Sequence, residues 1–147
     1  MIVRVVLTSL VLSTVLQAGP IVPVERLPYA QRTAATDSLL IAHPVNPLSN
    51  GDTLTLLYRG PARDVYLAGD HTAWEPTLPF RHIPGTDLWV LRQVHAPTAR
   101  LDYKLVLDGQ WVLDPRNPFT CEGGFGPNSA PRGADYRFPA WTDAQTT

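Results

Sequence analysis

Hydrophobic and polar residues alternate along the middle of the chain in short runs. Three such runs cover residues 52–58, 64–68 and 88–95, and each ends within a few residues at a glycine or a proline. Alternation with a period of two is typical of β-strands with one buried face, and glycine and proline are typical of turns. The pattern therefore predicts an all-β fold of short strands.

The clearest pattern lies in residues 100–113, where two alternating runs flank Asp108-Gly109. This dipeptide readily takes positive φ at both central positions of a type I′ turn, so we expect a two-residue β-hairpin. Val106 then lies opposite Trp111, and each face of the hairpin follows from the pairing. The face toward the core carries the apolar residues Leu101, Tyr103, Leu105, Leu107 and Val112. The other face carries Lys104, Val106 and Trp111.

After the hairpin, a glycine-rich loop at residues 123–126 leads to a last candidate strand around residues 134–138. About six short strands, with turn signals roughly every ten residues and no long helix, are typical of an immunoglobulin-like β-sandwich. A chain of 147 residues has room for one such core.

The N-terminal residues 1–18 predict a secretory signal peptide, because Arg4 precedes an apolar stretch too short to span a bilayer. We therefore expect a secreted or periplasmic protein with no membrane association after cleavage. A retained N-terminal anchor is the alternative, since Leu16 stands three positions before the end of the leader if cleavage follows Ala18, where a small residue is preferred.

Between the leader and the first predicted strand, residues 19–51 are rich in proline and small polar residues, which predicts an extended linker. Within it, residues 31–41 could form a short helix, although no sustained helical period supports one. The folded domain is expected over residues 52–141, with a tail at residues 142–147.

Composition excludes several classes of function. A net charge of -1 and a pI near 6.4 provide no basic field for nucleic acid. The single cysteine, Cys121, cannot form an intramolecular disulfide or a thiolate cluster, and we interpret it as a loop residue rather than a reactive thiol. The four histidines show no metal-ligand spacing, so neither a metal nor another cofactor is expected.

The sequence also contains no complete set of catalytic residues. No Gly-x-Ser-x-Gly elbow occurs, which a serine esterase of the α/β-hydrolase type would need. Asp70 follows a glycine and Asp114 precedes a proline, positions where carboxyl groups usually accept backbone hydrogen bonds in turns. We therefore expect a non-catalytic protein.

The outer face of the predicted hairpin suits sugar binding. The indole of Trp111 can cover the apolar face of a pyranose ring, and the ammonium of Lys104 can donate hydrogen bonds to its hydroxyls. The alternative is that the exposed tryptophan covers a hydrophobic surface against another domain.

The same residues resemble a known family. The run YKLVLDGQWVLDP (residues 103–115), with VYLAGDHTAW (65–74) and GTDLW (85–89), resembles carbohydrate-binding module family 48, the glycogen-binding domain of the AMP-activated protein kinase β subunit. The resemblance covers residues 52 to about 138 and implies an early-set β-sandwich that binds an α-glucan or a related oligosaccharide or polysaccharide. The sugar-binding residues that it implies are Trp74, Lys104, Trp111 and, across a longer loop, Asn128.

A second and more specific resemblance covers LDPRNPFTCEGGFGPNSAPR (residues 113–132). This run is similar to the early-set domain that precedes the α/β-hydrolase in bacterial esterases of the enterochelin and feruloyl type. It implies that the chain is an accessory N-terminal domain whose aromatic face packs on a hydrolase domain absent from these residues. Carbohydrate binding is thus the first hypothesis, and the accessory esterase domain is the alternative.

Overall fold

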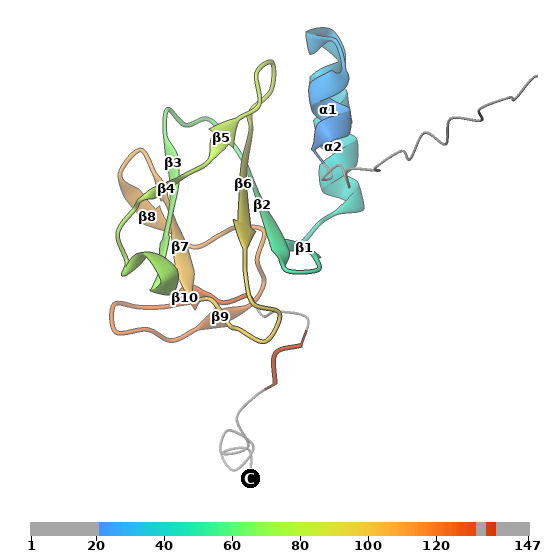
Figure 1. The fold of residues 1–147 in the computed structure, drawn as a ribbon. Helices are drawn as coiled ribbons and strands as arrows, with labels where there is room; N and C mark the ends of the chain where they lie inside the picture. Colours follow the sequence, from blue (N-terminus) through green and yellow to red (C-terminus); the bar gives the residue numbers. More distant parts are fainter. Residues whose placement is uncertain (1–20, 132–134, 138–147) are drawn as a thin grey trace, which may run out of the picture.

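Two antiparallel β-sheets packed face to face form the body of the protein (Figure 1). The computed structural model describes residues 21–131 and 135–137. We call the four-stranded sheet, with strand order β1-β2-β6-β5, sheet A, and the six-stranded sheet, with order β4-β3-β7-β10-β9 and β8 also paired to β7, sheet B. The predicted all-β sandwich of the immunoglobulin-like type is confirmed.

The strands are short, as the alternating runs predicted. Sheet A consists of β1 (Leu48–Asn50), β2 (Thr53–Arg59), β5 (Arg81–His82) and β6 (Leu88–Val94). Sheet B consists of β3 (Val65–Gly69), β4 (Leu78–Pro79), β7 (Tyr103–Leu107), β8 (Gln110–Val112), β9 (Thr120–Cys121) and β10 (Asn128–Ser129). A 3-10 turn, η1 (Asp70–Thr72), follows β3.

The pairing of β2 with β6 determines which residues of sheet A enter the core. Leu56 lies opposite Leu91 and Tyr58 opposite Trp89, and all four are buried between the sheets. The intervening Leu57 therefore points away from sheet B.

The predicted hairpin is confirmed in its turn and its register. Asp108 and Gly109 both have positive φ, at 48° and 85°, and Val106 lies opposite Trp111. The Asp108 carboxylate also accepts hydrogen bonds from the backbone N–H groups of Arg63 (2.8 Å) and Asp64 (2.9 Å). These bonds lower the pKa of Asp108, so the turn is tied to the start of β3 by an ionised acceptor.

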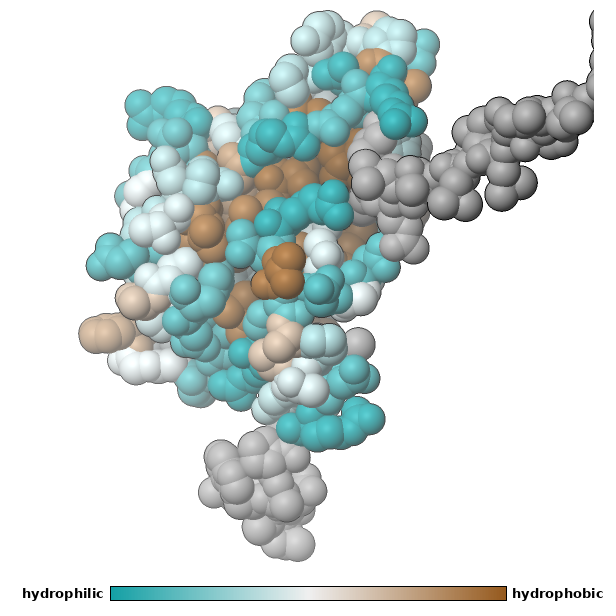
Figure 2. Space-filling view, in the orientation of Figure 1, coloured by the Kyte–Doolittle hydropathy of each residue, from teal (hydrophilic) through white to brown (hydrophobic). Residues whose placement is uncertain are grey.

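The extended linker predicted for residues 19–51 is wrong for the part that the structure describes. Two helices, α1 (Val22–Arg26) and α2 (Tyr29–Ala42), cover the outer face of sheet A and are followed by β1. Ile21, Val24 and Leu40 pack there against four buried residues of the sheet and its β5–β6 turn, namely Leu57, Ile83, Leu88 and Val90. Figure 2 shows this side of the molecule, with apolar side chains gathered between the helices and the strands.

The possible helix at residues 31–41 thus exists and is longer than its sequence pattern indicated. Of the α2 residues, Thr36 and Leu40 are buried and Ala35 and Leu39 are partly buried against the same cluster, so the helix carries only a short apolar stripe. Tertiary contacts determine the position of α2, because packing of the helix on the aliphatic outer face of sheet A removes that face from water.

Arginines attach the helix pair to the sheet. The Arg32 guanidinium donates to the backbone oxygens of Leu27 and Glu25 within the helix pair and to that of Pro84 in the β5–β6 turn (2.8 Å). Arg59 of β2 pairs with Asp37 of α2. These contacts hold α1 and α2 as a third layer on the sandwich.

A buried polar cluster joins the residues after α2 to the hairpin. The amide of Asn46 donates to the carboxyl group of Asp114 (2.9 Å) and to the Leu57 carbonyl (2.7 Å). The Tyr103 hydroxyl also donates to Asp114 (2.6 Å), and burial followed by the nearby Asp114 charge raises the pKa of Tyr103. Asp114 is therefore a buried hydrogen-bond acceptor, as its turn position suggested, and it links three segments.

Several predicted segments lie partly or wholly outside the described residues. The leader at residues 1–18 and the tail at 142–147 are not described, and the domain boundaries stay predictions. Of the last candidate strand at residues 134–138, only 135–137 are described, and they are not a strand. No helix within residues 21–131 or 135–137 is long and apolar enough to cross a membrane.

Candidate functional site

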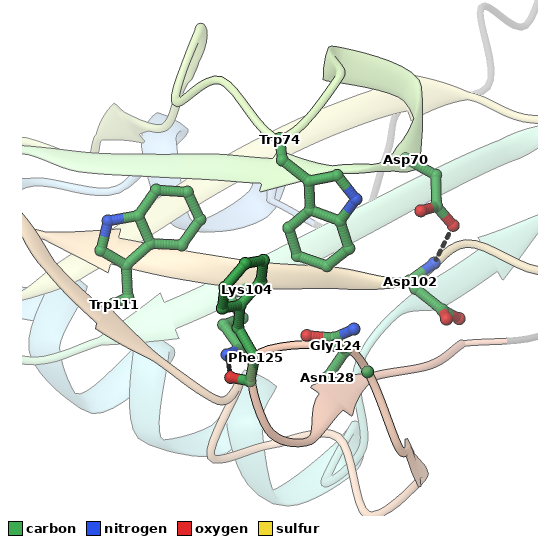
Figure 3. A pocket seen from close by; sticks show the side chains of 9 residues that line it. Asp70, Trp74, Asp102, Lys104, Trp111, Gly124, Phe125 and Asn128 are labelled. Atoms are coloured by element: carbon green, nitrogen blue, oxygen red, sulfur yellow. Dashed lines mark hydrogen bonds between the residues drawn. The ribbon is translucent and has the colours of Figure 1, made fainter.

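A pocket of about 760 Å³ opens on the outer face of sheet B, the face opposite to the one that the core covers (Figure 3). Its lining combines three aromatic side chains, three charged ones, one amide and two glycines: Asp70, Trp74, Asp102, Lys104, Trp111, Gly123, Gly124, Phe125 and Asn128. In Figure 3, Trp111 lies at one end of the pocket and Asp70 and Asp102 lie at the other, with Trp74 and Lys104 between them.

The strand register places the two hairpin residues on this face. Lys104 lies opposite Ala68 of β3, and Trp111 lies opposite Val106 of β7. Because directly opposed residues of an antiparallel pair project to the same side, and alternate residues of β7 share a side, Lys104 and Trp111 project together away from the core. Trp111 remains 47% exposed, so its ring is available to a ligand.

Trp74 reaches the pocket from the loop after β3. Thr72 and Gly69 exchange two hydrogen bonds, since the Thr72 hydroxyl accepts from the Gly69 N–H (3.0 Å) and donates to the Gly69 carbonyl (3.1 Å). Ala73 and Trp74 then both take positive φ, at 52° and 64°. Such a conformation costs a residue with a Cβ on the order of 1 kcal/mol, and here it directs the indole over sheet B.

Gly69 permits this loop to lie close to the next strand. A Cβ at Gly69 would stand 2.4 Å from the backbone oxygen of Asp102 and 2.9 Å from Cβ of Tyr103. Only glycine therefore fits where the tryptophan loop crosses the start of β7.

A third aromatic ring comes from the glycine-rich loop. Phe125 is 98% exposed, and its backbone oxygen accepts a hydrogen bond from the Lys104 ammonium (3.2 Å). Gly126, which follows it, has a φ of 84°. The loop thus presents a large apolar side chain to water at the rim of the pocket.

Asn128 lies deeper in the same pocket. It is only 7% exposed, and a Cβ at Gly123 would stand 2.4 Å from its side-chain nitrogen. The Asn128 side-chain amide lines the pocket and can both donate and accept hydrogen bonds. An amide in the lining of a pocket is suited to a ligand with hydroxyl or carbonyl groups.

Hydrogen bonds hold both carboxylates at the acidic end of the pocket, Asp70 and Asp102, in position. The Asp70 N–H donates to the Asp102 carbonyl (3.0 Å), and the Asp102 N–H donates in return to Oδ2 of Asp70 (3.1 Å). The Asp102 carboxylate pairs with Arg100 through two hydrogen bonds of 2.9 and 3.0 Å, which raise the pKa of Arg100. Asp102 therefore forms an ion pair with Arg100, whereas Asp70 forms none with the described residues.

Cys121 stands beside this end rather than in an isolated loop. Its thiol donates to Oδ2 of Asp102 (2.9 Å). Burial and this hydrogen bond raise the pKa of Cys121 to about 11, so the thiol is protonated and unreactive at neutral pH.

All four residues predicted as a site, Trp74, Lys104, Trp111 and Asn128, line one pocket. Their role in sugar binding stays a prediction. Sequence reasoning missed Phe125, whose position between glycines in a loop was an available signal, and it interpreted Asp70 only as a turn residue. In the described part of the chain, no group of three His, Cys, Asp or Glu side chains is placed to hold a metal ion.

The described fold occurs in solved esterases. The chain matches part of the enterochelin esterase from Shigella flexneri, with 18% identity and a TM-score of 0.56 over 69% of this chain and 37% of the esterase. It matches the enterobactin esterase from Shigella flexneri, solved in the presence of enterobactin, with 18% identity and a TM-score of 0.57 over 72% of this chain and 37% of that one.

The ferric enterobactin esterase from Salmonella typhimurium gives a similar match, with 17% identity and a TM-score of 0.58 over 72% of this chain and 38% of that one. The chain thus spans a little over a third of the length of these esterases. No protein-family model and no curated protein sequence matches the chain. At such identities the likeness establishes the fold and not the activity.

Proposed function

We propose that this protein is a non-catalytic accessory domain that works beside an α/β-hydrolase domain of a bacterial serine esterase. The observation that carries the proposal is the fold likeness to a portion of three enterochelin or enterobactin esterase structures. In those proteins more than half of the chain lies outside the matched region, which leaves room for a separate catalytic domain. The resemblance of residues 113–132 to the domain before such hydrolases agrees with this.

The chemistry of the pocket supports an accessory role rather than catalysis. Its only thiol neighbour, Cys121, has a raised pKa, and Asp102 is held in an ion pair with Arg100. A nucleophile with a lowered pKa or an adjacent free base is what acyl transfer needs. The aromatic and polar lining is suited instead to binding, either of part of the esterase substrate or of the hydrolase surface.

The proposal is tested by coexpression of the chain with an α/β-hydrolase encoded beside it, in or out of frame. We expect the two to copurify and the kcat/KM of the hydrolase for aryl esters to rise when the chain is present. The chain alone should hydrolyse no ester above a mock preparation. Ester hydrolysis by the purified chain, or a hydrolase whose kinetics do not respond to it, would contradict the proposal.

A second candidate function is carbohydrate binding by the same pocket. It is favoured by the convergence of Trp74, Lys104, Trp111 and Asn128 on one opening. We infer stacking of an α-glucan or a related oligosaccharide on the indoles, with Lys104 and Asn128 bound to its hydroxyls. Burial of one ring face and a few hydrogen bonds correspond to a dissociation constant of roughly 0.01 to 1 mM after association costs.

Calorimetric titration with maltoheptaose and affinity electrophoresis in glycogen test this second function. Binding should disappear in a Trp74→Ala, Trp111→Ala double variant. No retention by glycogen, with no heat up to about 10 mM maltoheptaose, would leave the accessory role alone. Either function suits the exported protein that residues 1–18 predict, and secretion of a chain with its native N-terminus would test that prediction.

A further inference from the structure

The carboxylate of Asp70 is a hydrogen-bond acceptor that is held in position at the pocket and keeps one oxygen available for a ligand. The carboxylate of Asp70 is held through Oδ2 by the Asp102 N–H (3.1 Å), while its own N–H is held by the Asp102 carbonyl (3.0 Å). Among the described residues, no donor reaches the second oxygen, Oδ1. In Figure 3 this oxygen lies on the Trp74 side of the carboxylate.

The other carboxylate of the pocket is fully engaged. Both oxygens of Asp102 accept from Arg100, and Oδ2 also accepts from the Cys121 thiol. Asp70 is therefore the charged acceptor that the lining leaves for a ligand, whereas Lys104 and the Trp74 indole N–H are donors and the Asn128 amide can both donate and accept.

This arrangement selects the chemistry of the ligand. An ammonium ligand would satisfy Asp70 but would be repelled by Lys104 in the same pocket, and a carboxylate ligand would suffer the reverse. Hydroxyl groups both donate and accept, so neighbouring hydroxyls at the edge of one ring satisfy the acceptor and the donors together. A ring lying against Trp74 would carry such hydroxyls at its edge, next to Asp70.

We propose that Asp70 is a specificity residue of the pocket, whose free carboxylate oxygen accepts hydrogen bonds from a vicinal pair of hydroxyls on a ring that stacks on Trp74. The inference rests on the ligand-binding role proposed for this pocket. The vicinal hydroxyls can belong to a pyranose or to a dihydroxylated aromatic ring, because both present two adjacent O–H donors at the edge of a ring whose apolar face can stack on an indole.

The test compares three probes on the whole chain by calorimetry or tryptophan fluorescence. Maltoheptaose represents the pyranose source, 2,3-dihydroxybenzamide represents the aromatic source, and 2-hydroxybenzamide is the aromatic probe without the vicinal pair. Asp70→Asn removes the charge but keeps an oxygen for the Asp102 N–H. Glu75→Gln, an equal change of charge at an exposed residue of the same loop that does not line the pocket, is the matched control.

In the wild-type chain we expect binding of maltoheptaose or of 2,3-dihydroxybenzamide, and the one that binds identifies the source. Asp70→Asn should weaken that binding about fivefold or more, in line with a lost hydrogen bond to a charged group. The Glu75→Gln variant should stay within about twofold. For the aromatic source, 2-hydroxybenzamide should bind Asp70→Asn and wild type alike.

The possible failures can be told apart. If the wild-type chain binds a vicinal-hydroxyl probe and Asp70→Asn binds it equally, the inference about Asp70 is overturned while the pocket keeps its ligand role. Equal weakening for 2-hydroxybenzamide would also overturn it. If the wild-type chain binds none of the probes, the ligand role of the pocket fails as well. Thermal unfolding of each variant shows whether a loss reflects misfolding.

Discussion

The two sheets of the sandwich have outer faces of opposite character. The outer face of sheet A is aliphatic, carries Leu57, Leu88 and Val90, and is covered by α1 and α2. The outer face of sheet B carries tryptophans, a lysine and carboxylates, and it stays open as a pocket. Exclusion of water from an aliphatic face stabilises the fold, and here α1 and α2 cover that face. Aromatic rings with polar atoms at their edges can instead remain exposed to water and bind a ligand. The comparison assigns stability to one face and recognition to the other.

The largest effect is expected on the covered face. Leu57→Ala removes a fully buried side chain beneath the helices and should lower the free energy of unfolding by about 3 kcal/mol, through lost burial and a cavity. Urea unfolding, monitored by circular dichroism, measures this change in the free energy of unfolding. Val94→Ala, in the same sheet but 77% exposed, should change it by less than about 0.5 kcal/mol. Equal effects in both variants would mean that the helices do not seal this face.

The opposite outcome is expected on the open face. The Trp74→Ala, Trp111→Ala double variant should weaken binding of the probe that the wild-type chain binds by about 30-fold or more, because each ring face that a ligand covers is lost. Its free energy of unfolding should stay within about 1 kcal/mol of wild type. Phe119→Ala, an exposed aromatic residue outside the pocket lining, serves as the control. If the double variant instead lost much stability and bound the probe as wild type does, the open face of sheet B would contribute to stability and not to binding.

A third prediction concerns the edge of the open face, where Cys121 bonds to Asp102. The pKa of this thiol is raised to about 11, so iodoacetamide at pH 8 should alkylate it at least about tenfold more slowly than a model cysteine peptide. The rate should keep rising until the pH approaches 11.

The direction of the pH effect on stability follows from the same pKa. Because the folded-state value lies above the unfolded value of 9.0, the contribution of this thiol to stability is fully present below pH 9 and is lost as the pH rises through about 11. The alkylation rate of Cys121 in the urea-unfolded protein is the reference for the folded protein. If the alkylation rate of the folded protein levels off near pH 9, burial and the hydrogen bond to Asp102 do not raise the pKa of Cys121.

The smallest effect is expected in the loop that carries Trp74. Ala73→Gly should raise the free energy of unfolding by about 0.5 kcal/mol, because glycine takes a φ of 52° without strain but gains freedom in the unfolded chain. Ligand affinity should fall slightly if the strain helps to hold the indole in place. Ala96→Gly, at an exposed residue without positive φ, should instead destabilise. A loss of stability at Ala73 would show that this strain is absent in solution.

The sequence predicts best what is determined locally. Asp108-Gly109 and its flanking alternation fix the hairpin, the register and hence the shared face of Lys104 and Trp111, because each depends on residues a few positions apart. The helix pair could not be predicted with the same certainty. In α2 only Thr36 and Leu40 are fully buried, with Ala35 and Leu39 partly buried beside them, so the apolar stripe is short and the helix forms against a sheet whose residues lie far along the chain.

The site was predictable in part for the same reason. The hairpin pair follows from register, whereas the place of Trp74 depends on the reciprocal bonds of Thr72 with Gly69 and on positive φ at two residues that are not glycine. The free oxygen of Asp70 depends on a contact with a residue 32 positions away. Such contacts leave no mark in composition or periodicity.

The hydrogen bond between Asn46 and Asp114 has a practical consequence for dissection of this protein. Its two residues lie 68 positions apart, so a fragment that starts at the first alternating run, near Asp52, would leave Asp114 without its amide donor and would expose the aliphatic side of Leu57 and Val90. We expect such a fragment to aggregate, and its failure to retain glycogen would report lost folding rather than an inactive pocket. Work on isolated pieces should therefore keep everything from Ile21 onward.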